Sequence, residues 1–243
     1  MENDLRSESR VGRFYGVGVG PGDPELLTLK GARVLRECSV VVVPKKGSHD
    51  ASYAYSIVRD LIDTGRQELL DLVFPMKKDL DQLVSYWEEA VDEIHRRLID
   101  GKDCVFLTEG DPFFYGTFIY IYRILRERHP EVEMEVVPGV TSLNASAARS
   151  CLPLVNGDDR LAVLPATYEG ESLRKALQEF DAVVLLKVNS VFDKVLDLLE
   201  ELGLAEKAVF VKKCTAHDEE IVRDVRSLRG KKLDYLSLLI VRK

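Results

Sequence analysis

Residues 14–24, Phe-Tyr-Gly-Val-Gly-Val-Gly-Pro-Gly-Asp-Pro, constrain the fold of this chain more than any other stretch. Tyr15, Val17 and Val19 alternate with glycines, which predicts one face of a short strand. The glycines continue at every second position beyond it and leave the backbone bare where the strand ends, so another backbone or a ligand can approach closely. Asp23 before a proline is typical of a helix N-cap. The stretch therefore predicts a strand that ends in a ligand-facing turn.

The spacing of these glycines argues against a phosphate ligand. The dinucleotide fingerprint Gly-x-Gly-x-x-Gly fails in each register, because Pro21 or Asp23 stands where its third glycine is required. No Gly-Lys-Ser/Thr follows, so the Walker pattern fails as well. Asp23 and Glu25 would repel a pyrophosphate at a helix start. The turn favours a neutral or cationic ligand; the alternative is that its glycines only let a helix pack against the strand.

Composition narrows the class of protein. At 243 residues the chain is long enough for one large domain or two small ones. Its formal net charge of -7 argues against a general nucleic-acid or membrane-surface binder. The four cysteines have neither a metal-type nor a disulfide-type spacing, which favours a reducing compartment. With no apolar signal core and no apolar run near the roughly 20 residues of a membrane span, we expect a cytoplasmic protein.

Strand and helix patterns alternate through the first half of the chain. After the opening strand, strands are predicted at 40–43, 69–74, 104–107 and 134–137, and helices at 29–35, 54–61, 79–98, 119–125 and 144–148. Two of these strands run into turns like the first one, Glu-Gly-Asp-Pro at 109–112 and Pro-Gly at 138–139. Ligands of an open parallel sheet bind at the carboxyl ends of its strands. Three such turns therefore predict a binding site at one edge of a sheet.

The alternation is interrupted at 151–159, which predicts a domain boundary there, and then resumes. Strands are predicted at 161–164, 182–186, 208–211 and 236–241, and helices from Glu171 and at 193–202. A strand at the end of a chain usually pairs inside a sheet, and Ile221 and Val222 indicate an antiparallel neighbour.

Three motifs together resemble the tetrapyrrole methylase family. They are Gly-Val-Gly-Pro-Gly-Asp-Pro-Glu-Leu-Leu-Thr-Leu-Lys-Gly at 18–31, Glu-Gly-Asp-Pro-Phe-Phe-Tyr-Gly at 109–116 and Val-Pro-Gly-Val-Thr-Ser at 137–142. The resemblance covers the chain from Arg13 onward. It implies an α/β fold of two domains, 12–138 with a mostly parallel sheet and 139–243 with a mixed sheet, and a cleft between them. It also implies S-adenosylmethionine as cofactor, a homodimer, and an acidic modified tetrapyrrole as methyl acceptor.

Further stretches resemble the branch of the family that methylates the C(20) carbon of precorrin-2 in corrin (cobalamin) biosynthesis. They are the residues 44–47, 55–58, 74–76, 108–112 and 160–168. The resemblance implies an in-line transfer of a methyl group from the cofactor's sulfonium to this meso carbon, in precorrin-2 or in its cobalt complex. No metal-ligand cluster is visible in the sequence, so any metal would arrive with the substrate.

The same resemblance implies a set of cofactor-binding residues: Pro21, Glu109, Gly110, Asp111, Phe114, Thr141, Ser142, Lys187 and Cys214. Backbone groups and hydroxyls suit the adenosine and amino-acid ends of the cofactor, and a carboxylate suits an ammonium, a ribose hydroxyl or a sulfonium. Lys187 and Cys214 match the family more weakly, at the ends of two predicted strands, and a purely structural role is the alternative for both.

Charge alone gives candidates for binding the carboxylates of the substrate. They are Lys45, Lys46, His49, Arg160 and Lys212. No residue stands out as a general base.

Two classes of alternative stay open at this stage. One is a methylase of the same fold with another acceptor, such as uroporphyrinogen, a later precorrin, a modified histidine or ribosomal RNA, the last disfavoured by the net negative charge. The other is a non-catalytic nucleotide-binding module, although three ligand-type turns are more than a simple sensor needs. S-adenosylhomocysteine in the natively purified protein would separate an enzyme from such a module.

Overall fold

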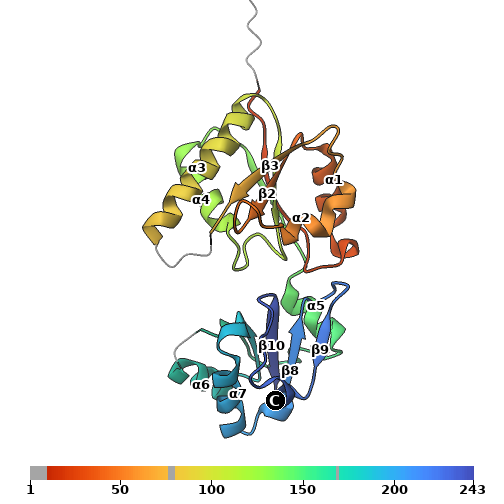
Figure 1. The fold of residues 1–243 in the computed structure, drawn as a ribbon, viewed down its shortest axis with the longest axis vertical. Helices are drawn as coiled ribbons and strands as arrows, with labels where there is room; N and C mark the ends of the chain where they lie inside the picture. The colour runs from red at the N-terminus through yellow and green to blue at the C-terminus, as the bar shows by residue number, and fades with distance from the viewer. Residues whose placement is uncertain (1–9, 76–79, 168–169) are drawn as a thin grey trace, which may run out of the picture. The chain divides into compact units, whose positions relative to one another are not determined.

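The computed structural model describes residues 10–75, 80–167 and 170–243 (Figure 1). The chain divides into two compact units, one ending at Thr141 and one comprising Ser142–Lys243. The first unit holds a five-stranded parallel sheet and the second a five-stranded mixed sheet, which confirms the predicted fold class. The division falls in the connection between the fifth strand and the fifth helix, ahead of the interruption at 151–159 where the broken pattern predicts a boundary.

The first unit is built from β1 to β5 and α1 to α4. Its strands, arranged in the order β3-β2-β4-β1-β5, are β1 (Phe14–Gly18), β2 (Val40–Lys45), β3 (Glu68–Val73), β4 (Cys104–Thr108) and β5 (Met134–Val137). Its helices are α1 (Leu29–Glu37), α2 (Tyr53–Val58), α3 (Leu80–Ile99) and α4 (Phe118–Arg128), with the 3-10 turns η1 (Pro24–Leu26) and η2 (Arg59–Leu61).

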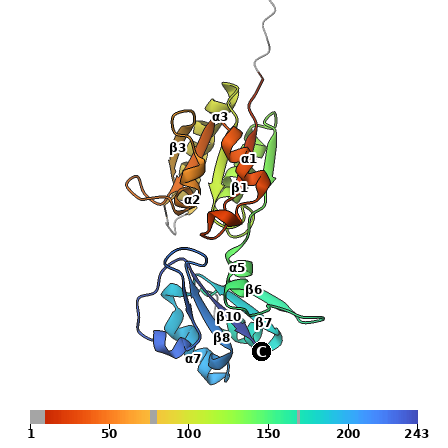
Figure 2. The ribbon, with the colours of Figure 1, turned by 90° about the vertical axis from the view of Figure 1, so that its right-hand side faces the viewer.

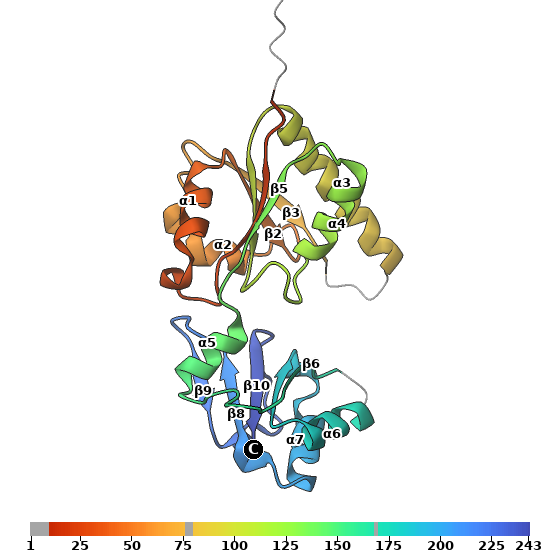
Figure 3. The same cartoon turned by 180° about the vertical axis from the view of Figure 1, so that it is seen from behind.

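Helices cover both faces of this sheet, α1 and α2 on one side and α3 and α4 on the other (Figures 1 and 3). Successive strand residues point to opposite faces, so β1 gives Val17 to the core beneath α1 and Phe14 to the core beneath α4. A Cβ at Gly16 would lie 2.2 Å from the Phe118 ring, so this glycine lets α4 approach the strand. Gly16 therefore serves to let a helix pack against the strand, which is the alternative to contact with a ligand.

Two predicted helix starts are confirmed by their caps. The Asp23 carboxylate accepts a hydrogen bond from the Glu25 backbone nitrogen at 2.8 Å, with Pro24 at the first position of η1. The Thr28 hydroxyl accepts one from the Gly31 nitrogen at 3.0 Å and begins α1. Both caps bind backbone N–H groups that a helix start leaves unpaired.

Two details differ from prediction. Strand β2 continues through Pro44 to Lys45, because its pairing with β4 ends at Val42 and a residue without an N–H is tolerated beside one partner strand. Along α3, Trp87 is buried as predicted, but Val84 keeps 40% of its surface exposed. The buried stripe of α3 therefore begins one turn later than its apolar pattern indicates.

The second unit is built around an antiparallel central strand. Its strands, arranged in the order β6-β7-β10-β8-β9, are β6 (Leu161–Pro165), β7 (Ala182–Leu186), β8 (Ala208–Lys212), β9 (Glu220–Val222) and β10 (Ser237–Arg242) (Figure 2). Its helices are α5 (Ser142–Arg149), α6 (Gly170–Glu179) and α7 (Phe192–Glu201), with the 3-10 turns η3 (Val188–Ser190), η4 (Ala205–Lys207) and η5 (Val225–Leu228). The predicted central place of the last strand and the antiparallel β9 are both confirmed.

The core of the second unit lies between its sheet and helices α6 and α7, where Leu177, Leu196, Phe210 and Leu239 are buried together. Helix α5 lies beside β8 and β9 (Figures 1 and 3). None of the helices in the described part of the chain is long and apolar enough to cross a membrane.

Candidate functional site

The first two glycine turns of the first unit are joined backbone to backbone. Because β1 and β4 pair in parallel with Gly18 opposite Thr108, their carboxyl ends emerge side by side. The Gly110 nitrogen donates a hydrogen bond to the Gly20 carbonyl at 2.9 Å, and the Val19 nitrogen donates to the Thr108 carbonyl at 2.9 Å. Gly20 has a φ of +82°, which glycine adopts without strain.

The third turn approaches the other two more closely than any side chain would allow. A Cβ at Gly139 would lie 2.0 Å from the Gly110 carbonyl oxygen, and a Cβ at Gly18 would lie 2.4 Å from the same atom. Strand β5 pairs with β1 on the side away from β4, so its carboxyl end meets the same edge of the sheet. The structure thus brings the three predicted turns together at this edge, which we call the carboxyl edge.

Asp111 locks the second turn to the third. One oxygen of its carboxylate accepts a hydrogen bond from the Phe113 backbone nitrogen at 2.9 Å, and the other accepts one from the Gly139 backbone nitrogen at 3.1 Å. Two of its hydrogen-bonding sites are therefore used within the protein. The sequence motif gave no indication of the long-range link to Gly139, which depends on how the strands are ordered in the sheet.

Glu109 and Thr108 present polar atoms at the end of β4. The Glu109 side chain is accessible to water, yet desolvation by the surrounding protein raises the pKa of its carboxyl, and the ammonium group of Lys46 partly opposes that rise. The Thr108 hydroxyl is buried and has no hydrogen-bond partner within the described residues. A buried hydroxyl without a partner is costly, and this one lies directly before the second glycine turn.

The aromatic residues after Asp111 form the outer part of the turn. Phe114 is half-buried and packs edge-on against Tyr115, with ring centroids 5.0 Å apart. Tyr115 has a φ of +54°, a conformation that L-residues rarely adopt and that is concentrated at functional sites. Pro21 is buried, and its carbonyl accepts a hydrogen bond from the Tyr53 hydroxyl at 3.1 Å, a contact that the sequence did not indicate.

Three of the predicted substrate-binding residues lie at the end of β2 or just after it, at the same edge of the sheet. Lys45 forms an ion pair with Asp71 on β3, with 2.6 Å between Nζ and Oδ2. Lys46 is exposed and close enough to act on the Glu109 carboxyl, and His49 is exposed. The carboxyl edge of the first unit therefore carries positive groups beside its carboxylates.

In the second unit, one edge of the sheet collects the loops after β7 and β8. Lys187, which follows β7, is exposed and has a φ of +56°. Lys213 and Thr215, which flank Cys214, have φ values of +43° and +66°. Lys212 ends β8 and forms an ion pair with Glu220 at 2.7 Å. Ser142 begins α5, directly after Thr141, the last residue of the first unit.

Glu219 organises the loop around Cys214. Its side chain is only 11% exposed. Its carboxylate accepts hydrogen bonds from two guanidinium nitrogens of Arg149 at 2.7 to 3.1 Å and from the Thr215 backbone nitrogen at 2.6 Å. The Arg149 guanidinium holds the pKa of the Glu219 carboxyl below its usual range, against an opposing effect of desolvation. Burial raises the pKa of the Cys214 thiol to about 11. Cys214 is therefore an uncharged, buried side chain at neutral pH. The Arg149–Glu219 pair was not predicted from the sequence.

Arg160 lies apart from the other predicted residues of the second unit. It precedes β6, whereas Lys187 follows the parallel neighbour β7, so the two stand at opposite edges of the sheet. Its guanidinium donates to the Glu179 carbonyl and lies 5.5 Å from the centre of the Phe180 ring. The stretch 160–168 that begins with it ends at Tyr168, outside the described residues, as does Met76 of the stretch 74–76.

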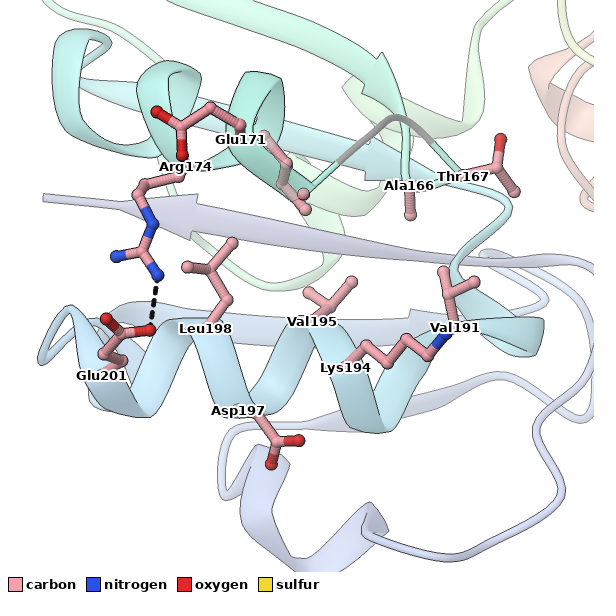
Figure 4. A pocket seen from close by; sticks show the side chains of 12 residues that line it. Ala166, Thr167, Glu171, Arg174, Val191, Lys194, Val195, Asp197, Leu198 and Glu201 are labelled. Carbon is pink, nitrogen blue, oxygen red and sulfur yellow. Dashed lines mark hydrogen bonds and ion pairs between the residues drawn. The ribbon is translucent and has the colours of Figure 1, made fainter.

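A cavity of about 580 Å³ opens between α6 and α7 (Figure 4). Val195 and Leu198 on α7 and Val191 just before it form the apolar side of the cavity, and the Arg174–Glu201 ion pair spans one end at 2.5 Å. None of the predicted cofactor or substrate residues lines this cavity.

Comparisons with known proteins agree with these motifs. The family model described as Tetrapyrrole (Corrin/Porphyrin) Methylases matches residues 13–228. A probable cobalt-precorrin-2 C(20)-methyltransferase of Methanocaldococcus jannaschii is 37% identical, over 96% of this chain and 97% of the relative. A precorrin-2 C(20)-methyltransferase of a Sinorhizobium species is 33% identical, over 84% of this chain and 85% of the relative. Uroporphyrin-III C-methyltransferase of Thermus thermophilus, solved in complex with S-adenosylhomocysteine, has a TM-score of 0.66 at 26% identity, covering 96% and 98% of the two chains.

Proposed function

This chain belongs to the tetrapyrrole (corrin/porphyrin) methylases, and from that premise we infer that it transfers a methyl group from S-adenosylmethionine to C(20) of precorrin-2 or of its cobalt complex. The observation that carries the choice of acceptor is the match along nearly the whole of both chains to relatives named for that reaction. The reaction belongs to corrin (cobalamin) biosynthesis.

The groups at the carboxyl edge of the first unit fit this cofactor better than they fit a nucleotide phosphate. Glu109 offers a carboxylate at the end of β4, which suits ribose hydroxyls, an ammonium group or a positively charged sulfur. Of the residues that the motifs imply, we propose that Pro21, Glu109, Gly110, Phe114 and Thr141 bind the cofactor from this edge. Asp111 acts by holding the second and third turns in place.

In the second unit, we propose that Ser142, Lys187 and Cys214 contribute to the cofactor site. The support is conformational: Lys187 and the two neighbours of Cys214 all have left-handed backbone, which persists only where the surrounding structure enforces it. Because the Cys214 thiol is buried and uncharged, we expect it to make an apolar contact.

S-adenosylmethionine supplies a methyl group that the positive charge on sulfur already activates. The bond from methyl carbon to sulfur breaks as the bond to C(20) forms, and C(20) releases a proton. The chain's own task is to bind, to orient and to exclude water, which together can contribute about 7–11 kcal/mol to lowering the barrier. The tightly joined glycine turns provide the rigid backbone that such orientation needs.

We propose that Lys45, Lys46 and His49 meet the carboxylates of the acceptor, because Lys45 ends β2 and the other two follow it at the carboxyl edge. Lys212 is a second candidate, although it already pairs with Glu220. Arg160 stands at the opposite edge of its sheet from Lys187, and we leave it out of this proposal. Each charge-assisted contact to a carboxylate contributes about 1.5–3 kcal/mol.

We further propose a homodimer in the cytoplasm. The homodimer rests on the family resemblance alone. The cytoplasmic location is supported by four cysteines that are all free thiols, as expected in a reducing compartment.

Ligand-dependent thermal unfolding and methyl-transfer assays test this function together. At 100 times its dissociation constant, S-adenosylmethionine should add about 2.7 kcal/mol to the free energy of unfolding, while NAD and ATP add nothing measurable. Labelled methyl from S-adenosylmethionine should then appear in precorrin-2 and not in uroporphyrinogen III. Protection by NAD alone would contradict the cofactor, binding without transfer to any tetrapyrrole would indicate a non-catalytic module, and transfer to uroporphyrinogen alone would place the chain in another branch of the family.

A further inference from the structure

Two histidines and a glutamate meet on the first unit, His95 from α3 and the pair His129 and Glu131 from the segment before β5. His95 lies in the last part of α3, His129 caps the carboxyl end of α4, and Glu131 follows in the turn before β5. The imidazole rings are stacked with centroids 3.4 Å apart. One oxygen of Glu131 lies 3.1 Å from Nε2 of His95 and 3.5 Å from Nδ1 of His129. No pattern in the sequence indicates this cluster.

The cluster lies at the opposite edge of the sheet from the glycine turns. It sits at the end of α4 and just before β5 begins, whereas the three turns follow the ends of β1, β4 and β5. It is therefore distinct from the proposed methyl-transfer site.

Protonation of both imidazole rings would destabilise this cluster. Two imidazolium rings in such close contact would repel each other. His129 faces the Glu131 carboxylate with Nδ1, whereas its Nε2 is buried and has no hydrogen-bond partner within the described residues.

The spacing of the ligand atoms suits a small transition-metal ion. The two nitrogens and the carboxylate oxygen lie within 4.8 Å of one another. A tetrahedral ion with bonds of about 2.0–2.1 Å holds its donors roughly 3.4 Å apart, close to the two distances measured to Glu131. About a fifth of each histidine side chain is exposed, so an ion can reach the cluster from solvent. The rings are nearly parallel, so one of them must turn out of the stack to aim its lone pair at the same ion.

We propose that His95, His129 and Glu131 form a binding site for one divalent transition-metal ion, with Zn²⁺ as the natural probe. Imidazole and carboxylate ligands favour Zn²⁺, Ni²⁺ or Cu²⁺ over Mg²⁺ or Ca²⁺. Three protein ligands leave the remaining coordination position to water. The ion ties α3 to the turn between α4 and β5 and so acts on stability.

Neighbouring charges set how the affinity depends on pH. Asp92 on α3 forms an ion pair with Arg128 on α4 at 2.8 Å, and both act on His129, the carboxylate favouring a cation and the guanidinium opposing it. Because protons compete with the ion for the ring nitrogens, binding should weaken as the pH falls.

Metal titration of the full chain, purified without a polyhistidine tag and freed of metal with a chelator, tests the site. Zn²⁺ binding is followed by calorimetry, and Co²⁺ binding by its visible spectrum, which distinguishes nitrogen and oxygen ligands from thiolate. The chain has four histidines, so His49→Gln and His217→Gln serve as matched controls for His95→Gln and His129→Gln. A Cys151→Ser background removes the exposed thiol as a competing ligand.

We expect one Zn²⁺ per chain at pH 7.5, a Co²⁺ spectrum without thiolate bands, and a higher thermal midpoint with Zn²⁺. His95→Gln, His129→Gln and Glu131→Gln should each weaken binding by at least the roughly 10- to 100-fold that loss of an outer-shell partner costs, while the two control variants bind normally. Glu131→Gln is an exposed substitution and keeps the test informative if a histidine variant unfolds. Absence of binding in the unsubstituted chain, or unchanged binding in the three variants, would overturn the proposal.

Discussion

Gly139→Ala is the substitution that most directly probes how the three glycine turns are joined. The added Cβ would lie 2.0 Å from the Gly110 carbonyl oxygen and 2.8 Å from the Gly18 backbone, where ordinary contacts begin at 3.4 Å. These neighbours are backbone atoms that cannot swing aside like a side chain. One turn must therefore move by more than an ångström relative to the other two.

The cost of that movement follows from what it breaks. Overpacking of a rigid site costs about 1–3 kcal/mol. The Gly139-to-Asp111 hydrogen bond at 3.1 Å and the Gly110-to-Gly20 bond at 2.9 Å are both at risk, at about 1 kcal/mol each. We expect the free energy of unfolding of the first unit to fall by about 2–4 kcal/mol, with weaker binding of S-adenosylmethionine.

The chain offers its own reporter for the assay. Trp87 is the single tryptophan, is buried on α3, and so follows the first unit in a denaturant titration monitored by fluorescence. Gly170→Ala is the control, because a Cβ there would meet nothing within 4 Å. If Gly139→Ala unfolds at the same denaturant concentration as Gly170→Ala and binds the cofactor normally, the account of the joined turns is wrong.

Three further outcomes follow from other contacts. Asp111→Ala removes an acceptor of two backbone hydrogen bonds and should lower the free energy of unfolding of the first unit by about 2 kcal/mol, by the same fluorescence titration; an unchanged transition would show that these bonds carry no stability. Arg149 lowers the pKa of the Glu219 carboxyl, so the stabilisation from this carboxylate is present above pH ~4.3 and is lost as the pH falls through the lower pKa of the folded state. The difference in thermal midpoint between the unsubstituted chain and Glu219→Gln should therefore shrink from pH 6 to pH 3. A constant difference would contradict the pairing. Burial raises the pKa values of Cys38, Cys104 and Cys214, so an aromatic disulfide reagent at pH 8 should react with one thiol per native chain, Cys151, and a second fast equivalent would refute this.

The order and type of the elements were largely predictable, because both the alternating apolar pattern and the turn residues are local signals. Strands β5 and β7 begin and end where the sequence predicts, and the caps at Asp23 and Thr28 are as expected. Pro44 is the instructive exception, since its place inside β2 depends on which neighbour strand stops first. Which neighbour of β2 ends first is a property of the whole sheet and cannot be inferred from Pro44 itself.

The meeting of the three glycine turns was predictable from the sequence, whereas the contacts that join them were not. Gly110 and Asp111 were identified from motifs, but the link from Asp111 to Gly139 requires the order in which β4, β1 and β5 stand. Charge logic placed Arg160 with the substrate, and topology sets it at the far edge of its sheet, because side-chain charge carries no information on strand direction. The pairing of Arg149 with Glu219 spans 70 residues and escaped sequence reasoning for the same reason.

Position-specific analysis of the product tests the central claim most directly. The full chain is incubated with precorrin-2, metal-free and cobalt-loaded in parallel, and with S-adenosylmethionine carrying a ¹³C-labelled methyl group, and the product is examined by NMR. We predict one labelled methyl group, attached at C(20), with S-adenosylhomocysteine formed in equal amount. Label at any other carbon, or turnover of uroporphyrinogen III with none of either form of precorrin-2, would contradict the assigned reaction.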